Sequence, residues 1–135
     1  MNLWAYNANV YIRGNLWGRK LEDHWKTMNV KRAGEIPLFL DSWWPGGAPA
    51  GTDAPPAVNG PPAPAGNLAA NAYHIPEMPH FCIDRHSKGT INGVFMDSSV
   101  RKLGLKQLWK LRWHRNWKEA EVPEWPDWMK EFKDY

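Results

Sequence analysis

With 135 residues, 43% of them apolar, the chain is long enough for one globular domain built around a single core. Its formal net charge of +3 is small, and its one cysteine, Cys82, excludes an intramolecular disulfide. We find no stretch of about 18 apolar residues and no export signal, so we expect no membrane span in this chain.

The first predicted element is a helix over 17–28, where apolar side chains recur at helical spacing. These side chains are Trp17, Leu21, Trp25 and Met28. A short buried strand is predicted over 36–40, after Gly34 and a residue that precedes proline have ended any helix. We expect the N-terminal helix to pack on an antiparallel sheet of three or four strands, which makes the fold class α+β.

Residues 45–66 form a Pro/Gly-rich segment with seven prolines and five glycines. The segment has little apolar bulk and no regular period, so we predict an extended loop of polyproline character. We interpret it as a long insertion between two strands of one sheet. It is expected to be ordered on the surface, where Trp43 and Trp44 would hold it.

Three further strands are predicted over 78–84, 91–97 and 100–103. Residues 87–89 supply a turn, since Gly89 can take the positive φ that tight hairpin loops need. A hairpin closed at this turn would bring His86 close to Asp97, and we predict that the two side chains form a structural pair.

The last part of the chain, 104–135, is predicted to be a Trp-rich helical extension of the same domain, which spans 1–135. Its longer helix, 105–118, carries a stripe of tryptophans at helical spacing. Asp127 is predicted to cap a short final helix. The chain has ten tryptophans, which either fill the core or form a surface for a partner. The predicted interaction surface consists of Trp109, Trp113, Trp117, Arg112 and Arg115.

Charge is divided unevenly near the C-terminus. Residues 101–118 contain seven basic residues and no acidic one, whereas 119–135 contain six acidic residues and two lysines. These blocks predict that the tail folds back on the basic segment or docks on a neighbouring molecule. Nucleic-acid binding by the basic segment is disfavoured, because the acidic tail is an internal partner.

Carbohydrate binding is a further alternative. It requires that several tryptophans face solvent in a row, and the candidates are Trp43, Trp44, Trp125 and Trp128.

A set of potential metal ligands alternates along the predicted strand 78–84 and its continuation. His80, Cys82, Asp84 and His86 would point to one face of a strand, and Asp97 on the partner strand would join them. Such a face suits zinc or another transition metal, which would allow hydrolysis. However, neighbours two residues apart on a strand are about 7 Å apart, which suits two ligands of one ion better than four. No nucleophile elbow, Walker loop or dinucleotide-binding motif is present.

The stretch from Arg85 to Arg115 also carries a resemblance to a known family. Its matching segments are 85–86, 91–97, 99–102, 104–109 and 111–115, with 36–41 upstream and 125–129 downstream. They resemble the C-terminal signature of the prepilin-type H-X9-DG proteins, a pseudopilin-like family. The chain departs from the signature in two places: ten residues separate His86 from Asp97, and Ser98 replaces the usual glycine.

The resemblance implies the soluble head of a type II secretion pseudopilin or type IV pilin-like protein, without the family's N-terminal helix. Such a head would be a structural subunit in the periplasm or at the cell surface, in contact with other pseudopilin or secretion-system subunits or with copies of itself. The family also implies a structural Ca²⁺, for which Asp84, Asp97, His86 and Asp41 are candidates by chemistry alone. The alternative function is a small metal-dependent hydrolase of esters, lactones or glycans. It would use His80, Asp84, His86 and Asp97, with His86 and Asp97 as its catalytic residues.

Overall fold

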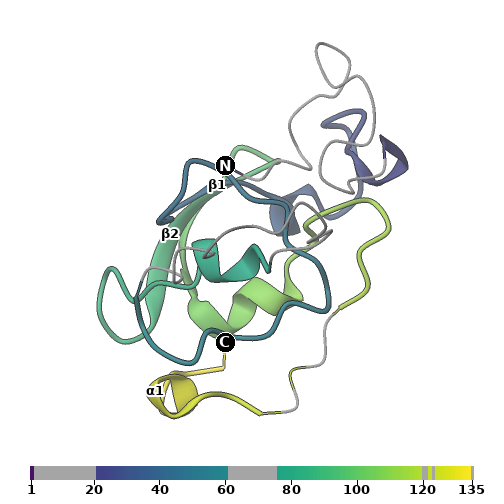
Figure 1. Ribbon diagram of the computed structural model, residues 1–135. Helices are drawn as coiled ribbons and strands as arrows, with labels where there is room; N and C mark the ends of the chain where they lie inside the picture. Colours follow the sequence, from purple (N-terminus) through teal and green to yellow (C-terminus); the bar gives the residue numbers. More distant parts are fainter. Residues whose placement is uncertain (2–20, 61–75, 120–121, 123, 135) are drawn as a thin grey trace.

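The structure is a computed structural model that describes Met1 and residues 21–60, 76–119, 122 and 124–134. Short elements alternate with irregular segments throughout these ranges (Figure 1). In chain order they are η2 (Leu21–Asp23), η3 (Ala33–Glu35), β1 (Pro37–Leu40), η4 (Met78–His80), β2 (Thr90–Phe95), β3 (Val100–Gly104), η5 (Leu105–Lys110) and α1 (Asp127–Lys130), where η denotes a 3₁₀ helix. The described residues contain no helix that is long and apolar enough to cross a membrane.

The centre of the fold is a three-stranded antiparallel sheet in the order β1-β2-β3. Phe39 is opposite Val94, and Val94 is opposite Val100 on the other side of β2. The predicted strands 36–40, 91–97 and 100–103 are thereby confirmed, with small differences at their ends. The β2–β3 connection is a tight turn, in which Ser98 adopts a left-handed conformation with φ 68°.

One face of the sheet is buried in the core. Side chains alternate between faces along β2, so Ile91 and Phe95 point inward, as do Leu40 on β1 and Leu103 on β3. Helices η4 and η5 also contribute side chains to this core, and η5 contacts β3. The residues that they and the following segments bury completely include Met78, Phe81, Leu105, Leu108 and Trp113. Each such side chain contributes roughly 1.5–3 kcal/mol by leaving water.

Four tryptophans tie irregular segments together through their indole N–H groups. Each donates a hydrogen bond to a backbone carbonyl: Trp25 to Trp113 at 3.2 Å, and Trp109 to Asp53, Trp113 to Leu108 and Trp128 to Pro56 at 2.8 Å each. An indole can bury a large apolar surface and still satisfy a polar group. These tryptophans therefore replace part of the bracing that longer helices supply in other domains.

The Pro/Gly-rich insertion is ordered by Asp53 and not by Trp43 and Trp44 as expected. The Asp53 side chain is 3% exposed, and its Oδ2 accepts hydrogen bonds from the backbone N–H groups of Ala50, Glu77 and Met78. Trp43 and Trp44 are instead exposed to solvent. Over its described part, 45–60, the insertion contains no helix and no strand of a sheet, as predicted. The remainder, 61–66, lies outside the described residues.

The predicted strand 78–84 is wrong. Its first residues form η4, with Pro79 in the first turn, where the missing proline N–H costs nothing. The Asp53 carboxylate binds the N–H groups of Glu77 and Met78, which a helix start leaves free. A residue from another part of the chain thus overrides the local preference for an extended conformation.

The two predicted helices differ from the structure in a similar way. Within the described part of 17–28, only η2 is helical, so packing of an N-terminal helix on the sheet is not shown. The helix predicted over 105–118 ends at Lys110 as η5. Beyond it, the Arg112 N–H donates to the Glu35 carbonyl at 2.9 Å instead of continuing the helix.

The tail folds back on the basic segment, as the charge blocks predict. Lys110 pairs with Asp134 at 3.1 Å, and the Lys106 ammonium lies 5.5 Å from the centre of the Trp125 ring. Apolar packing also stabilises the contact between the tail and the rest of the domain, because Met129 of α1 is completely buried. The cap of α1 is Pro126, and Asp127 instead accepts a hydrogen bond from Lys130.

Candidate functional site

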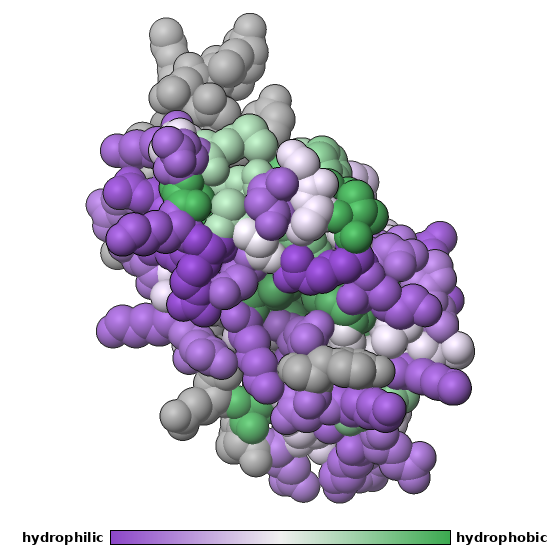
Figure 2. All heavy atoms as spheres, turned by 180° about the vertical axis from the view of Figure 1, so that it is seen from behind, coloured by the Kyte–Doolittle hydropathy of each residue, from purple (hydrophilic) through white to green (hydrophobic). Residues whose placement is uncertain are grey.

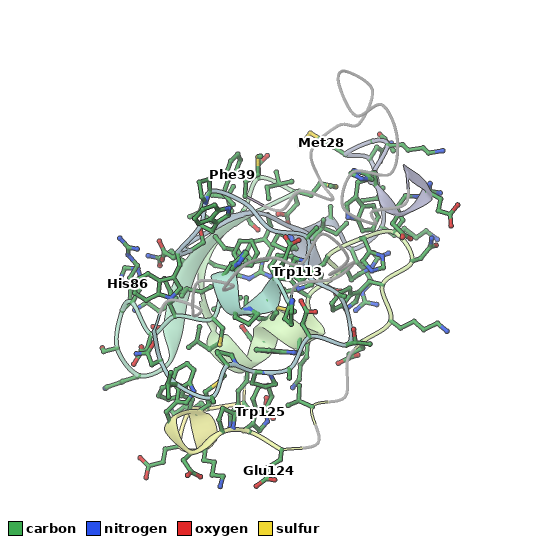
Figure 3. All side chains as sticks on the ribbon, viewed as in Figure 1. Met28, Phe39, His86, Trp113, Glu124 and Trp125 are labelled. Carbon is green, nitrogen blue, oxygen red and sulfur yellow. The ribbon has the colours of Figure 1, made fainter. Side chains whose placement is uncertain are left out.

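The outer face of the sheet carries a row of exposed apolar side chains. Phe39, Val94 and Val100 are neighbours across the three strands. Phe39 is 54% exposed and Val100 is 71% exposed, while Val94 between them is half-buried. Phe39 lies at the periphery of the molecule, whereas Trp113 lies near its centre (Figure 3). Three adjacent apolar side chains on an open sheet face are typical of a contact surface.

A polar row runs beside the apolar row on the same face. Asn92 is opposite Lys102 on β3, and Asp41 directly follows β1 on the other side of Asn92. The Asp41 Oδ2 accepts hydrogen bonds from the Asn92 backbone N–H at 2.9 Å and from His86 Nε2 at 2.8 Å. The face therefore has a carboxylate at one edge and an ammonium at the other.

His86 and Asp97 do not form the predicted pair. The partner of His86 is Asp41, and the Asn92 side-chain amide lies 2.9 Å from the same imidazole nitrogen. The segment before His86 is not a strand, so the turn at 87–89 does not close a hairpin onto Asp97. The two residues flank opposite ends of β2.

Asp97 instead organises the β2–β3 turn. Its Oδ1 accepts hydrogen bonds from the Ser99 backbone N–H at 2.9 Å and from the Ser99 hydroxyl at 2.6 Å. These bonds stabilise the carboxylate form, so the pKa of Asp97 is lowered below its usual value. Asp97 therefore has a local structural role in this turn.

The predicted metal face is not formed. Because 78–84 is not a strand, the alternation that would align His80, Cys82, Asp84 and His86 is lost. Asp84 Oδ1 accepts a hydrogen bond from the Gly89 backbone N–H at 3.0 Å. Asp97 instead accepts hydrogen bonds within the β2–β3 turn. In the part of the chain that the structure describes, no three His, Cys, Asp or Glu side chains gather as they must to hold a metal ion.

Two of the five residues of the predicted interaction surface belong to the interior. Trp109 and Trp113 are 1% and 0% exposed, and Trp117 is half-buried beside His114. Arg112 donates to the Lys31 carbonyl at 2.8 Å, and Arg115 donates to the Glu22 carbonyl at 3.3 Å. Each arginine thus joins the C-terminal extension to the segment that precedes β1. These residues therefore contribute to holding the fold together, although Arg115 remains exposed to solvent.

A shallow depression of about 500 Å³ lies where the insertion meets the segment before β2. It is lined by Trp43, Asn59, Gly60, Ile83, Asp84 and Arg85. The sequence named Trp43 as a candidate for carbohydrate binding and Asp84 as a candidate metal ligand, but it did not predict that the two line one depression. Asn59 was not predicted, because it reaches the site from a loop that has no periodic pattern.

The single cysteine is an inert core residue. Cys82 is completely buried, and its thiol lies 3.8 Å from the Met129 thioether. Burial disfavours the thiolate and raises the pKa of Cys82 far above its ordinary value. A nucleophilic or metal-binding role for this side chain has no support.

In comparisons with known proteins, no family model, no curated protein and no solved structure matches this chain.

Proposed function

We propose that this chain is a pseudopilin-like head domain that acts as a structural subunit and binds a neighbouring copy through the outer face of its sheet. The family resemblance over Arg85 to Arg115 is the reason for the pseudopilin assignment. The observation that carries the contact is the exposed row of Phe39, Val94 and Val100. Adjacent apolar side chains on a protein surface mark contact sites for other molecules.

Charge on this face favours a second copy as the neighbour. Asp41 lies at the β1 edge of the polar row and Lys102 at the β3 edge. Two sheets that pack face to face around a two-fold axis parallel to β2 place the β1 edge of one copy over the β3 edge of the other. Asp41 of each copy then faces Lys102 of its neighbour, and the apolar rows meet between them.

Apolar surface is not spread evenly over the molecule. Seen from behind, apolar atoms gather in the upper part, whereas hydrophilic side chains cover most of the lower part (Figure 2). Other pseudopilin or secretion-system subunits with the same arrangement of apolar and charged rows are further proposed partners of this chain.

Sedimentation equilibrium over a wide concentration range tests the contact. The chain is expected to self-associate, and Val100→Ser is expected to weaken the dimer on the order of tenfold, or about 1.4 kcal/mol. Val58→Ser is a matched control, because Val58 is 70% exposed in the insertion and Val100 is 71% exposed on the sheet. A chain that remains monomeric at every concentration, or an equal effect of both variants, contradicts the proposed contact.

Disulfide crosslinking provides a second test in cells. Since Cys82 is completely buried, Val100→Cys introduces a thiol that reacts selectively. In the two-fold arrangement Val100 of one copy lies over Phe39 of the other, so oxidation is expected to crosslink a mixture of Val100→Cys and Phe39→Cys chains. A crosslinked product from a mixture of Val58→Cys and Phe39→Cys chains, but not from this mixture, contradicts the assignment of the face.

In the structure Asp41 binds His86, Asp84 binds the Gly89 N–H and Asp97 binds Ser99. No three possible metal ligands gather among the described residues. A calcium ion in this protein stays a prediction of the resemblance. It is tested by metal analysis of the purified protein and by melts with and without EDTA, where a lower melting temperature in EDTA supports a structural ion.

A further inference from the structure

The depression lined by Trp43 combines one apolar wall with a closed floor. The Trp43 side chain is 45% exposed, although a large aromatic residue gains free energy by burial. Ile83 lies in the lining and is only 3% exposed, so it forms a fixed apolar base. The volume of about 500 Å³ lies within the range of small-molecule sites in proteins.

The backbone around Trp43 is held in place without the help of its indole ring. The Trp43 backbone N–H donates to the His80 carbonyl at 2.8 Å, which anchors the residue to η4. Within the described parts of the chain, no hydrogen bond to the Trp43 indole N–H is found, in contrast to the four bracing tryptophans. Trp43 therefore keeps its partly exposed aromatic face available for a ligand.

Polar groups of both kinds surround this aromatic face. Asn59 accepts the Asp84 backbone N–H through Oδ1 at 3.1 Å, which fixes its amide and leaves the Nδ2 group as a donor. Asp84 uses Oδ1 for the Gly89 N–H and keeps Oδ2 as an acceptor. Arg85 adds an exposed guanidinium, for which the described residues supply no acidic partner.

We infer that this depression is a carbohydrate-binding site in which a neutral pyranose ring stacks on Trp43. The C–H groups of a pyranose face match the negative π face of an indole. Sugar hydroxyls donate and accept hydrogen bonds, and the site offers donors from Asn59 and Arg85 and an acceptor from Asp84. Because the charges of Asp84 and Arg85 cancel, the site has no net preference for an ion. The inference does not depend on the proposed contact through the sheet.

Ligand-observed NMR titration with cellotetraose and with tetra-N-acetylchitotetraose tests the inference. At least one of these saccharides is expected to bind saturably, with a Kd on the order of 1 mM. Trp43→Ala is expected to weaken binding about tenfold or more, which corresponds to about 1.4 kcal/mol. Asp84→Asn keeps an oxygen for the Gly89 N–H, so the fold remains intact while binding weakens several-fold.

Trp44→Ala is the matched control. Trp44 is the next residue and is 64% exposed, but it does not line the depression. Its replacement is expected to leave saccharide affinity unchanged, and thermal melts confirm that all variants are folded. The inference is overturned by absence of saturable saccharide binding up to about 10 mM, or by equal affinity of Trp43→Ala and the unaltered chain. Binding of the zwitterion glycylglycine in place of the saccharides overturns the assignment of the ligand class.

Discussion

Replacement of Asp53 by alanine is expected to destabilise the domain strongly. The change leaves the N–H groups of Glu77 and Met78, now bonded at 2.8 and 2.9 Å, without their acceptor. A buried donor without a partner costs roughly 1–3 kcal/mol, so the two together cost about 3 kcal/mol. The third bond, from Ala50 at 3.2 Å, is longer and adds less. For a domain of this size, about 3 kcal/mol lowers the melting temperature by roughly 10 °C.

Urea titration and thermal melts measure this loss, and two further variants separate its causes. Asp53→Asn retains an oxygen acceptor but lacks the charge, so it should lose about half as much stability. Asp127→Ala is the matched surface control, because the Asp127 side chain is 95% exposed and its solvent-screened ion pair with Lys130 should contribute little to stability.

Native-state hydrogen exchange locates the effect. Exchange of the Glu77 and Met78 amides should accelerate in Asp53→Ala more than exchange of the β2 amides. A melting temperature of Asp53→Ala within about 2 °C of that of the unaltered chain would refute the role assigned to this carboxylate.

Three other predictions concern stability and reactivity. Gly89→Ala should cost about 1–3 kcal/mol, because Gly89 has φ +68° and an added Cβ would lie 2.3 Å from the Phe132 ring. Gly60→Ala should be nearly neutral, since nothing lies within 4 Å of an added Cβ there; equal melts of the two variants would contradict the packing of the tail on this turn. Burial lowers the pKa of His114, so its contribution to stability is lost as the pH falls below the unfolded-state pKa of about 6.5. The free energy of unfolding from urea titrations should therefore fall between about pH 7.5 and 5.5, and His114→Gln should reduce this fall. An unchanged pH dependence in the variant would contradict this. Cys82 should react with a thiol reagent at pH 8 only after denaturation, and rapid reaction of the native protein would contradict its burial.

The sheet was the predictable part of the fold, because its strands follow from local pattern. Ile91, Val94 and Phe95 favour an extended conformation, and β2 and β3 are joined by a short turn, so no distant residue decides their pairing. The Trp stripe of 105–118 was predicted as part of an interaction surface, but Trp109 and Trp113 are buried in the core and only the first part of the segment is helical.

The errors arise where a distant partner decides the local structure. Asp53 is 24 residues from Glu77 in sequence, yet its carboxylate starts η4 where a strand was predicted. His86 binds Asp41 across 45 residues and not Asp97 in its own segment. Neither contact can be recognised from the sequence, because each depends on one side chain and not on a periodic pattern of residues. Trp43 was named as a candidate for carbohydrate binding, but its polar neighbour Asn59 was not predicted for the same reason, since it joins a loop to a segment 25 residues away.

The four tryptophans whose indole N–H groups bind backbone carbonyls also have a consequence for the rate of folding. Three of the indole hydrogen bonds join residues that are 88, 56 and 72 positions apart. Strand β1 is likewise separated in sequence from β2, its partner in the sheet, by the whole insertion. Long loops must therefore close before burial of the core can compensate their entropy. We expect folding to be slow for a domain of this length, with the β2–β3 hairpin formed early and the insertion and tail locked in place late.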